Sequence, residues 1–175
     1  QGTVIEYVTD RLLQSEGLAP DEIKTIAVPK MADRIALLGS GELQAGVLPD
    51  PLATLAVNQG ARVVIDDSLH PEYGFSVISF RKTVIDENPQ AVRSFLAAIE
   101  EATSLLNQDP APYYNILDKQ KIIPKTLIRY RIPPFPLAGI PTQAEWEDAL
   151  NWAMGKGMLS NSVSYTDSVI SSFLP

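Results

Sequence analysis

Residues 28–56, VPKMADRIALLGSGELQAGVLPDPLATLA, contain the pattern that decides the expected fold. Apolar residues recur at helical spacing over about residues 32–38, and the glycines that follow are typical helix stop signals. The short apolar run 45–48 has the length of a buried strand. Asp50 then suits a helix N-cap and Pro51 the first helical position. Helix, strand and helix in close succession predict an alternating α/β arrangement.

Segments of both kinds flank this stretch. An amphipathic helix is predicted over residues 3–15, because Thr3 and Glu6 have the spacing of a capping box ahead of an apolar-periodic run. Besides 45–48, strands are predicted over residues 25–28, 62–66 and 74–81. Together with the central stretch they indicate a parallel or mixed sheet flanked by helices.

The second half of the chain has a different character. A long helix is predicted over about residues 89–107, and a second over 143–155, where Thr142 and Glu145 repeat the capping-box spacing. Short helices are expected within APYYNILDKQ and SYTDSVISSFLP. These helices need a sheet to pack on, yet the sequence after residue 81 supplies little of one. We therefore expect a part of the fold to lie outside this chain.

Composition excludes several classes of site. The chain has 175 residues, a formal net charge of −7 and no cysteine. The acidic balance argues against nucleic acid and anionic membranes as main partners. Without cysteine there can be no disulfide, thiolate metal site or cysteine nucleophile, and a single histidine, His70, rules out a multi-histidine metal site. We expect His70 to be exposed to solvent, since it lies in a polar loop beside a proline.

The order and spacing of several segments resemble the solute-binding proteins of ABC importers, in the branch that binds nitrate, aliphatic sulfonates, taurine and thiamine pyrimidines. The resemblance rests on the helix opened by Gly2 and Thr3, on residues 28–56, and on NPQAVRSFLAAIEEATSLLNQDP at 88–110. A tail of the form PT…E…A…W…GK, over residues 141–156, adds to it. No single motif is diagnostic, but the resemblance extends over nearly the whole chain.

The resemblance implies an α/β, periplasmic-binding-protein type II-like fold, in which two lobes clamp a ligand between them. This chain would then begin where the second lobe begins and looks N-terminally truncated. Residues 1–68 would form the second lobe, 69–81 the crossover or hinge region, and 82–175 the helix-rich returning part of the first lobe.

The first predicted helix supplies one group of candidate ligand-binding residues. Gly2, Thr3 and Val4 lie at its N-terminus, where unpaired N–H groups and a partial positive charge suit an anion. The resemblance implies that this helix faces the ligand. The alternative is that Thr3 does no more than cap the helix.

Three further candidates lie in loops. Asp50 could accept a hydrogen bond from an amine or ring N–H, or serve only as an N-cap. Met31 lies in a predicted strand-to-helix loop and Tyr73 borders the predicted crossover, although each could equally be packing. Leu48 and Pro49 replace the Trp-Glu-type pair that family members often carry, which weakens any prediction of ring stacking there. Residues 130–136, YRIPPFP, together with the preceding Arg129, are predicted to form a surface loop.

The most specific functional prediction is a solute-binding component of an ABC importer that binds a small anionic or heteroaromatic ligand in an interlobe cleft. It would be no enzyme, need no metal or cofactor, and bind a membrane permease but no nucleic acid. A dimer could complete the missing lobe. The resemblance implies a periplasmic or membrane-anchored, extracytoplasmic protein. The alternatives are the effector-binding domain of a transcription regulator and an inactive excised fragment.

Overall fold

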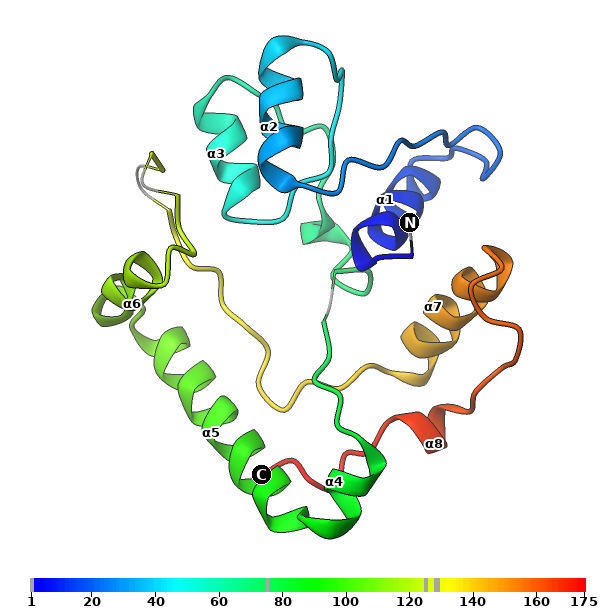
Figure 1. Cartoon of the computed structure of the whole chain (residues 1–175), viewed down its shortest axis with the longest axis vertical. Helices are drawn as coiled ribbons and strands as arrows, with labels where there is room; N and C mark the ends of the chain where they lie inside the picture. Colours follow the sequence, from blue (N-terminus) through cyan, green and yellow to red (C-terminus); the bar gives the residue numbers. More distant parts are fainter. Residues whose placement is uncertain (1, 75, 125, 128–129) are drawn as a thin grey trace. The chain divides into compact units, whose positions relative to one another are not determined.

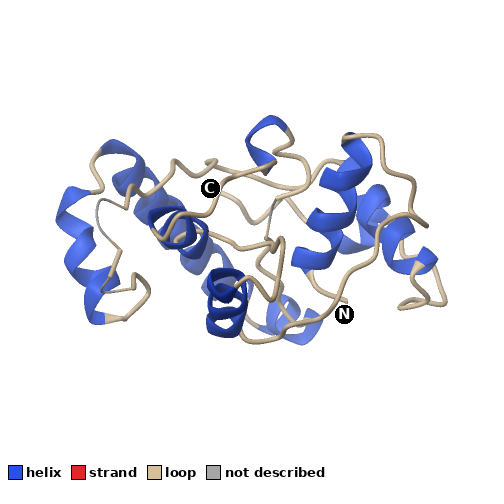
Figure 2. Cartoon of the chain, turned by 90° about the horizontal axis from the view of Figure 1, so that it is seen from above, coloured by secondary structure: helices blue, strands red, loops and turns tan. Residues whose placement is uncertain are grey.

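The computed structural model describes residues 2–74, 76–124, 126–127 and 130–175. Helices make up 49% of it, and these residues include no strand (Figure 2). The expected α/β, periplasmic-binding-protein type II-like fold is therefore wrong for this structure. The predicted strands 25–28, 45–48 and 62–66 are loops, as are the described residues of 74–81. A strand exists only through ladder hydrogen bonds to a neighbouring strand, and none of the described segments offers such a partner.

The chain folds into two units. One comprises Gln1–Phe75 and Asn115–Arg131, and the other comprises Ser76–Tyr114 and Ile132–Pro175. We refer to them as unit 1 and unit 2 and describe each by itself. The predicted division into lobes at residues 68 and 81 is a statement about a two-lobed binding fold and stays a prediction.

Unit 1 contains the first helices of the chain, of which α2 and α3 pack against each other (Figure 1). Its elements are α1 (Val4–Ser15), α2 (Met31–Ser40), α3 (Leu52–Asn58), the 3₁₀ turn η1 (Asp67–Leu69) and nearly all of α6 (Tyr114–Lys119). Thr3 caps α1, because its Oγ1 accepts a hydrogen bond from the backbone N–H of Glu6 at 3.4 Å. The predicted helix at 3–15 is thus confirmed. The buried residues of α1 are Tyr7, Asp10 and Leu12, and those of α3 are Leu55 and Ala56.

Arg34 on α2 connects the loops on either side of that helix. Its Nε donates to the backbone oxygen of Val28 at 2.7 Å, and its NH1 nitrogen donates to that of Val47 at 3.0 Å. Both carbonyls belong to segments that the sequence predicts as strands. In place of a strand-to-strand ladder, one half-buried guanidinium satisfies a backbone acceptor of each segment.

Unit 2 is built around one long helix. Its elements are α4 (Lys82–Glu87), α5 (Pro89–Gln108), the 3₁₀ turn η2 (Ala111–Tyr113), α7 (Gln143–Gly155) and α8 (Tyr165–Ser168). α4 packs on α5 and α7 on α8 (Figure 1). Val92 is the buried residue of α5, and the Phe95 ring meets the Phe80 ring edge-to-face with centroids 5.8 Å apart. The predicted helices 89–107 and 143–155 are confirmed, the second with both halves of the Thr142 capping box.

The proline-rich segment 132–138 runs along α5 and the residues that follow this helix up to Tyr114. Tyr114 Oη accepts from the backbone N–H of Ile132 at 3.2 Å. Glu100 Oε1 accepts from the backbone N–H of Ala138 at 2.7 Å. Between them, Asn107 binds the backbone of Phe135. The three side chains are seven residues apart, about two helical turns, and their partners are three residues apart, which suits an extended chain lying alongside a helix.

Many apolar side chains remain on the surface of both units. The most exposed are Val64 at 92%, Leu69 at 85% and Ile26 at 75%. Val64 and Ile26 lie in predicted strands, so their exposure follows from the missing sheet. None of the helices that the structure describes is long and apolar enough to cross a bilayer.

Candidate functional site

The N-terminus of α1 is accessible, as a ligand-facing helix end would require. Gly2 and Thr3 are exposed and Val4 is 48% exposed. However, Oε2 of Glu6 accepts a hydrogen bond from the backbone N–H of Gly2 at 2.7 Å. A carboxylate therefore already lies at the positive end of the helix dipole. An anionic ligand would have to compete with this side chain for the same N–H group.

A cluster of rings lies beside the second turn of α1. Tyr73 meets Tyr7 edge-to-face, with ring centroids 6.3 Å apart and planes at 84°. Its other neighbour is His70, stacked at 5.4 Å with planes 19° apart. Tyr7 follows Thr3 by four residues and so lies on the same side of the helix, one turn on. The structure thus brings Tyr73 to the helix that carries Gly2, Thr3 and Val4.

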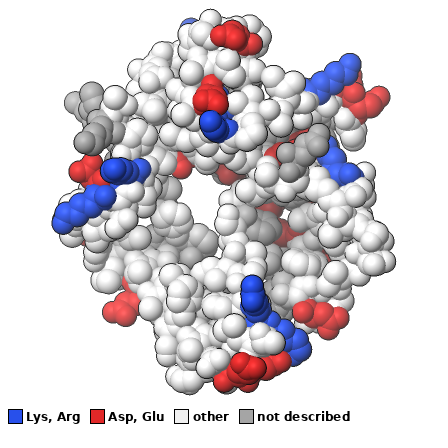
Figure 3. Space-filling view, in the orientation of Figure 1, with Lys and Arg blue, Asp and Glu red and all other residues white. Residues whose placement is uncertain are grey.

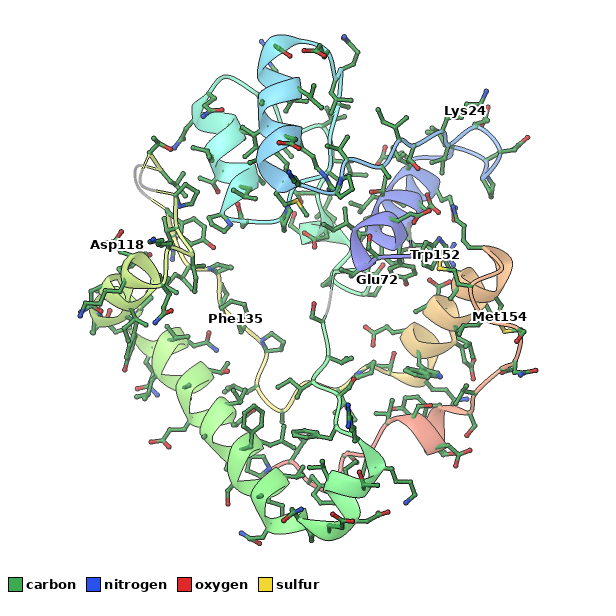
Figure 4. All side chains as sticks on the ribbon, viewed as in Figure 1. Lys24, Glu72, Asp118, Phe135, Trp152 and Met154 are labelled. Atoms are coloured by element: carbon green, nitrogen blue, oxygen red, sulfur yellow. The ribbon has the colours of Figure 1, made fainter. Side chains whose placement is uncertain are left out.

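His70 is half-buried in this cluster, so the expectation of a solvent-exposed histidine is wrong. The ring is covered because it stacks on Tyr73 and its Nδ1 lies 3.2 Å from Oε1 of Glu72. Glu72, labelled in Figure 4, lies in the loop beside α1. A hydrogen bond from its own backbone N–H, together with the one from His70, lowers the pKa of Glu72. We call Tyr7, His70, Glu72 and Tyr73 the ring cluster.

Arg11 extends the ring cluster along α1. Its guanidinium carbon lies 5.6 Å from the centre of the Tyr7 ring, within the range of a cation–π contact. The cluster therefore combines aromatic rings with one cation and one carboxylate; Tyr7 is buried, whereas Tyr73 and Glu72 are partly exposed. Such a set can hold an aromatic ring by stacking and can accept a hydrogen bond from a ring N–H or an amino group.

Asp50 and Met31 do not belong to this group. Oδ1 of Asp50 accepts from both the backbone N–H (3.1 Å) and the hydroxyl (2.7 Å) of Thr54. Asp50 thus caps α3, although the helix begins at Leu52 with Pro51 in the N-cap position, one residue later than predicted. Met31 is half-buried and begins α2. Within the described part of the chain, no hydrogen bond or ring contact joins either residue to α1 or Tyr73.

Unit 2 has a shallow cavity of about 240 Å³ that the sequence did not point to. One wall is α5, with Gln90, Arg93, Ser94 and Ala97, and the other is residues 173–175. Arg93 is already engaged, since it donates to the backbone oxygen of Ser172 and lies 4.6 Å from the centre of the Phe173 ring. The helical spacing of 90, 93, 94 and 97 is the signal that places them on one wall. The volume is below the usual range of ligand pockets, and none of the predicted site residues lines it.

Two other expectations concern aromatic residues. The tryptophans of α7 were expected to divide into one core and one partly exposed residue, but both are half-buried. Trp152, labelled in Figure 4, lies 5.7 Å from the Lys156 ammonium. In the predicted surface loop, Arg129 lies outside the described residues, and Phe135 is 48% exposed, which agrees with a surface position.

Charged side chains are dispersed over the face shown in Figure 3. They occur in small groups, some of both signs and some acidic only, separated by uncharged surface. Among the residues that the structure describes, no three histidine, aspartate or glutamate side chains are grouped so that they could hold a metal ion. The ring cluster with the α1 N-terminus is therefore the candidate site.

A family model described as the NMT1-like family matches residues 1–115. That family is related to periplasmic proteins that bind nitrate, sulfonate and taurine. No curated protein and no solved structure matches the chain. The matched range includes α1, the ring cluster, Met31 and Asp50.

Proposed function

The chain belongs to the NMT1-like family, and on this premise we propose that it is the solute-binding component of an ABC importer. It would bind a small anionic or heteroaromatic solute and deliver it to a membrane permease. It would catalyse no reaction, need no cofactor and act outside the cytoplasm, either in the periplasm or anchored to a membrane as a lipoprotein. The family match over residues 1–115 carries this proposal.

Of the two ligand classes, the geometry of unit 1 favours a heteroaromatic ring. Glu6 already provides an anion at the N-terminus of α1, so a second anion there meets like-charge repulsion. Tyr73, in contrast, is a partly exposed ring, and Glu72 offers a nearby acceptor whose pKa is lowered. A ring that bears an amino group could stack on a tyrosine and donate to that carboxylate.

Binding of defined solutes tests the proposal. We would titrate the purified chain by calorimetry with nitrate, taurine and an aminopyrimidine as probes. We expect binding of the aminopyrimidine to exceed that of the two anions. Tyr73→Ala should weaken it, since a stacking surface is lost, and Tyr73→Phe should restore it. Tyr113→Ala, a half-buried tyrosine of unit 2, is the matched control and should leave binding unchanged.

Two results would count against different parts of this proposal. If an anion binds and the aminopyrimidine does not, the solute-binding role stands but the ring preference is wrong. If none of the three probes binds to the folded chain, the solute-binding role itself fails for this class of ligand.

A further inference from the structure

His70 contacts both groups that the proposed function uses to recognise a solute. Its ring lies nearly parallel to that of Tyr73, with centroids 5.4 Å apart and planes at 19°. Its Nδ1 lies 3.2 Å from Oε1 of Glu72. The His70 side chain is 30% exposed and the Glu72 side chain 42%, so a solute can reach the carboxylate. One side chain thus joins the stacking surface to the hydrogen-bond acceptor.

The backbone around His70 brings these side chains together. The His70 N–H donates to the oxygen of Asp67 at 3.0 Å, and the His70 oxygen accepts from the N–H of Tyr73 at 3.1 Å. His70 therefore ends one turn and begins the next. The loop closes tightly at Gly74, where an added Cβ would lie 3.0 Å from the Asp67 Cγ and would displace that carboxylate. A loop that is folded before the solute arrives lowers the entropy cost of binding.

The hydrogen bond to Glu72 fixes the state of the imidazole. An ionised carboxylate can only accept, so Nδ1 of His70 carries the hydrogen and donates to Oε1. The backbone N–H of Glu72 is the largest cause that lowers the pKa of this carboxyl, and the bond from His70 is the second. A carboxylate offers roughly four acceptor positions, more than these two bonds occupy. Glu72 can therefore accept a further hydrogen bond from an amino group.

We propose that His70 is a positioning residue for solute recognition, since one imidazole backs the Tyr73 ring and orients the Glu72 carboxylate. The ring and the carboxylate would together bind a heteroaromatic solute that carries an amino group. This inference rests on the proposed function and adds to it the residue that links the two recognition groups. Loss of the hydrogen bond should affect only solutes with an amino group, whereas loss of the stack should affect any aromatic ring.

Two substitutions separate the two contacts. His70→Phe retains a ring that can stack on Tyr73 but has no donor for Glu72, whereas His70→Asn places an amide donor near the position of Nδ1 but has no ring. Carboxyl NMR titration should show a raised pKa of Glu72 in His70→Phe and a smaller rise in His70→Asn, because the donor is lost only in the first. Phe80→Leu, which alters the Phe80–Phe95 pair of unit 2, is the control and should leave Glu72 unchanged.

NMR titration with two probes measures the consequence for binding. The probes are an aminopyrimidine and the methylpyrimidine with its methyl group at the same ring position, so only the first can donate to Glu72. We expect His70→Phe to weaken binding of the aminopyrimidine about three- to tenfold, the usual value of one hydrogen bond, and to change that of the methylpyrimidine by less than about twofold. His70→Asn should weaken both by about threefold, because the ring behind Tyr73 is lost.

The outcomes distinguish a failure of this inference from a failure of the proposed function. An unchanged Glu72 midpoint in His70→Phe overturns the inference, because the imidazole then does not orient the carboxylate. Equal weakening of both probes in that variant overturns it too and indicates a purely structural role. If the Glu72 midpoint rises but neither probe binds the unsubstituted chain, the proposed function fails and the recognition role of His70 fails with it. The Glu72 titration needs no solute, so the two failures are separable.

Discussion

Asn107 on α5 forms both hydrogen bonds that a backbone neighbour would form with Phe135. Its Nδ2 donates to the Phe135 oxygen at 2.7 Å, and its Oδ1 accepts from the Phe135 N–H at 2.9 Å. The two residues are 28 positions apart. One amide side chain thus holds the proline-rich segment against the helix, where the neighbouring prolines have no N–H to donate.

The first prediction concerns this pair. Asn107→Ala should lower the free energy of unfolding by about 1 kcal/mol, the net value of one or two exposed hydrogen bonds. Asn107→Asp retains the oxygen that accepts from the Phe135 N–H, so it should lower the free energy of unfolding by less than Asn107→Ala does. Asn151→Ala, an exposed asparagine on α7 without a bond in the described structure, is the control for urea unfolding curves. If Asn107→Ala unfolds at the same urea concentration as Asn151→Ala, the pair contributes nothing to stability.

The second prediction concerns the two carbonyls held by Arg34. Arg34→Ala should destabilise the chain by about 2 kcal/mol, since two charge-assisted hydrogen bonds are lost and two backbone acceptors are left without a donor. Arg34→Lys should restore stability only partly, because an ammonium lacks the rigid fork that spans two acceptors. Thermal unfolding would measure both, with the exposed Arg81→Ala as the control. Full rescue by lysine would contradict the account.

The third prediction follows from the titration of Asp66. The hydroxyl of Ser68 is the largest cause that lowers the pKa of Asp66, followed by the backbone N–H of Ser68. A lowered pKa in the folded state stabilises the fold above the unfolded value of about 3.9, and this contribution is lost as the pH falls through the folded value. Ser68→Ala should therefore raise the pKa of Asp66 and weaken the loss of stability in acid. Carboxyl NMR titration would measure it, with Ser76→Ala as the control; an unchanged Asp66 midpoint would be the contrary result.

The fourth prediction concerns the carboxylate at the N-terminus of α1. Glu6→Gln removes a negative charge next to the Gly2 N–H and should strengthen binding of a small anion such as nitrate by about two- to fivefold. Glu16→Gln makes the same change at the other end of α1 and is the matched control for calorimetric titration. Equal effects of the two substitutions would show that only net charge matters and that the helix end is no anion site.

Much of the helical structure could be predicted from local sequence. The Thr142–Glu145 capping box, the Thr3 cap and Pro89 near the start of α5 all act within one helical turn of the residues that they fix. The order of these segments also indicated the solute-binding relatives to which the family match points. The site residues stay a prediction: Tyr73 contacts Tyr7 on the helix that begins after Gly2 and Thr3, whereas Asp50 binds Thr54.

The sequence by itself thus determined the positions of the longer helices to within a few residues, because every hydrogen bond of a helix closes within a few residues of its donor. The short helix α4 was not predicted, and α3 begins one residue later than expected. Only the tertiary structure decided whether the segments predicted as strands form a sheet, since the partner that a strand needs can lie anywhere in the chain or outside it. Residues 62–66 have the composition of a strand but no described neighbour, and so remain an exposed loop. The half-burial of His70, the Arg34 link and the Asn107–Phe135 pair depend in the same way on contacts that no local pattern specifies.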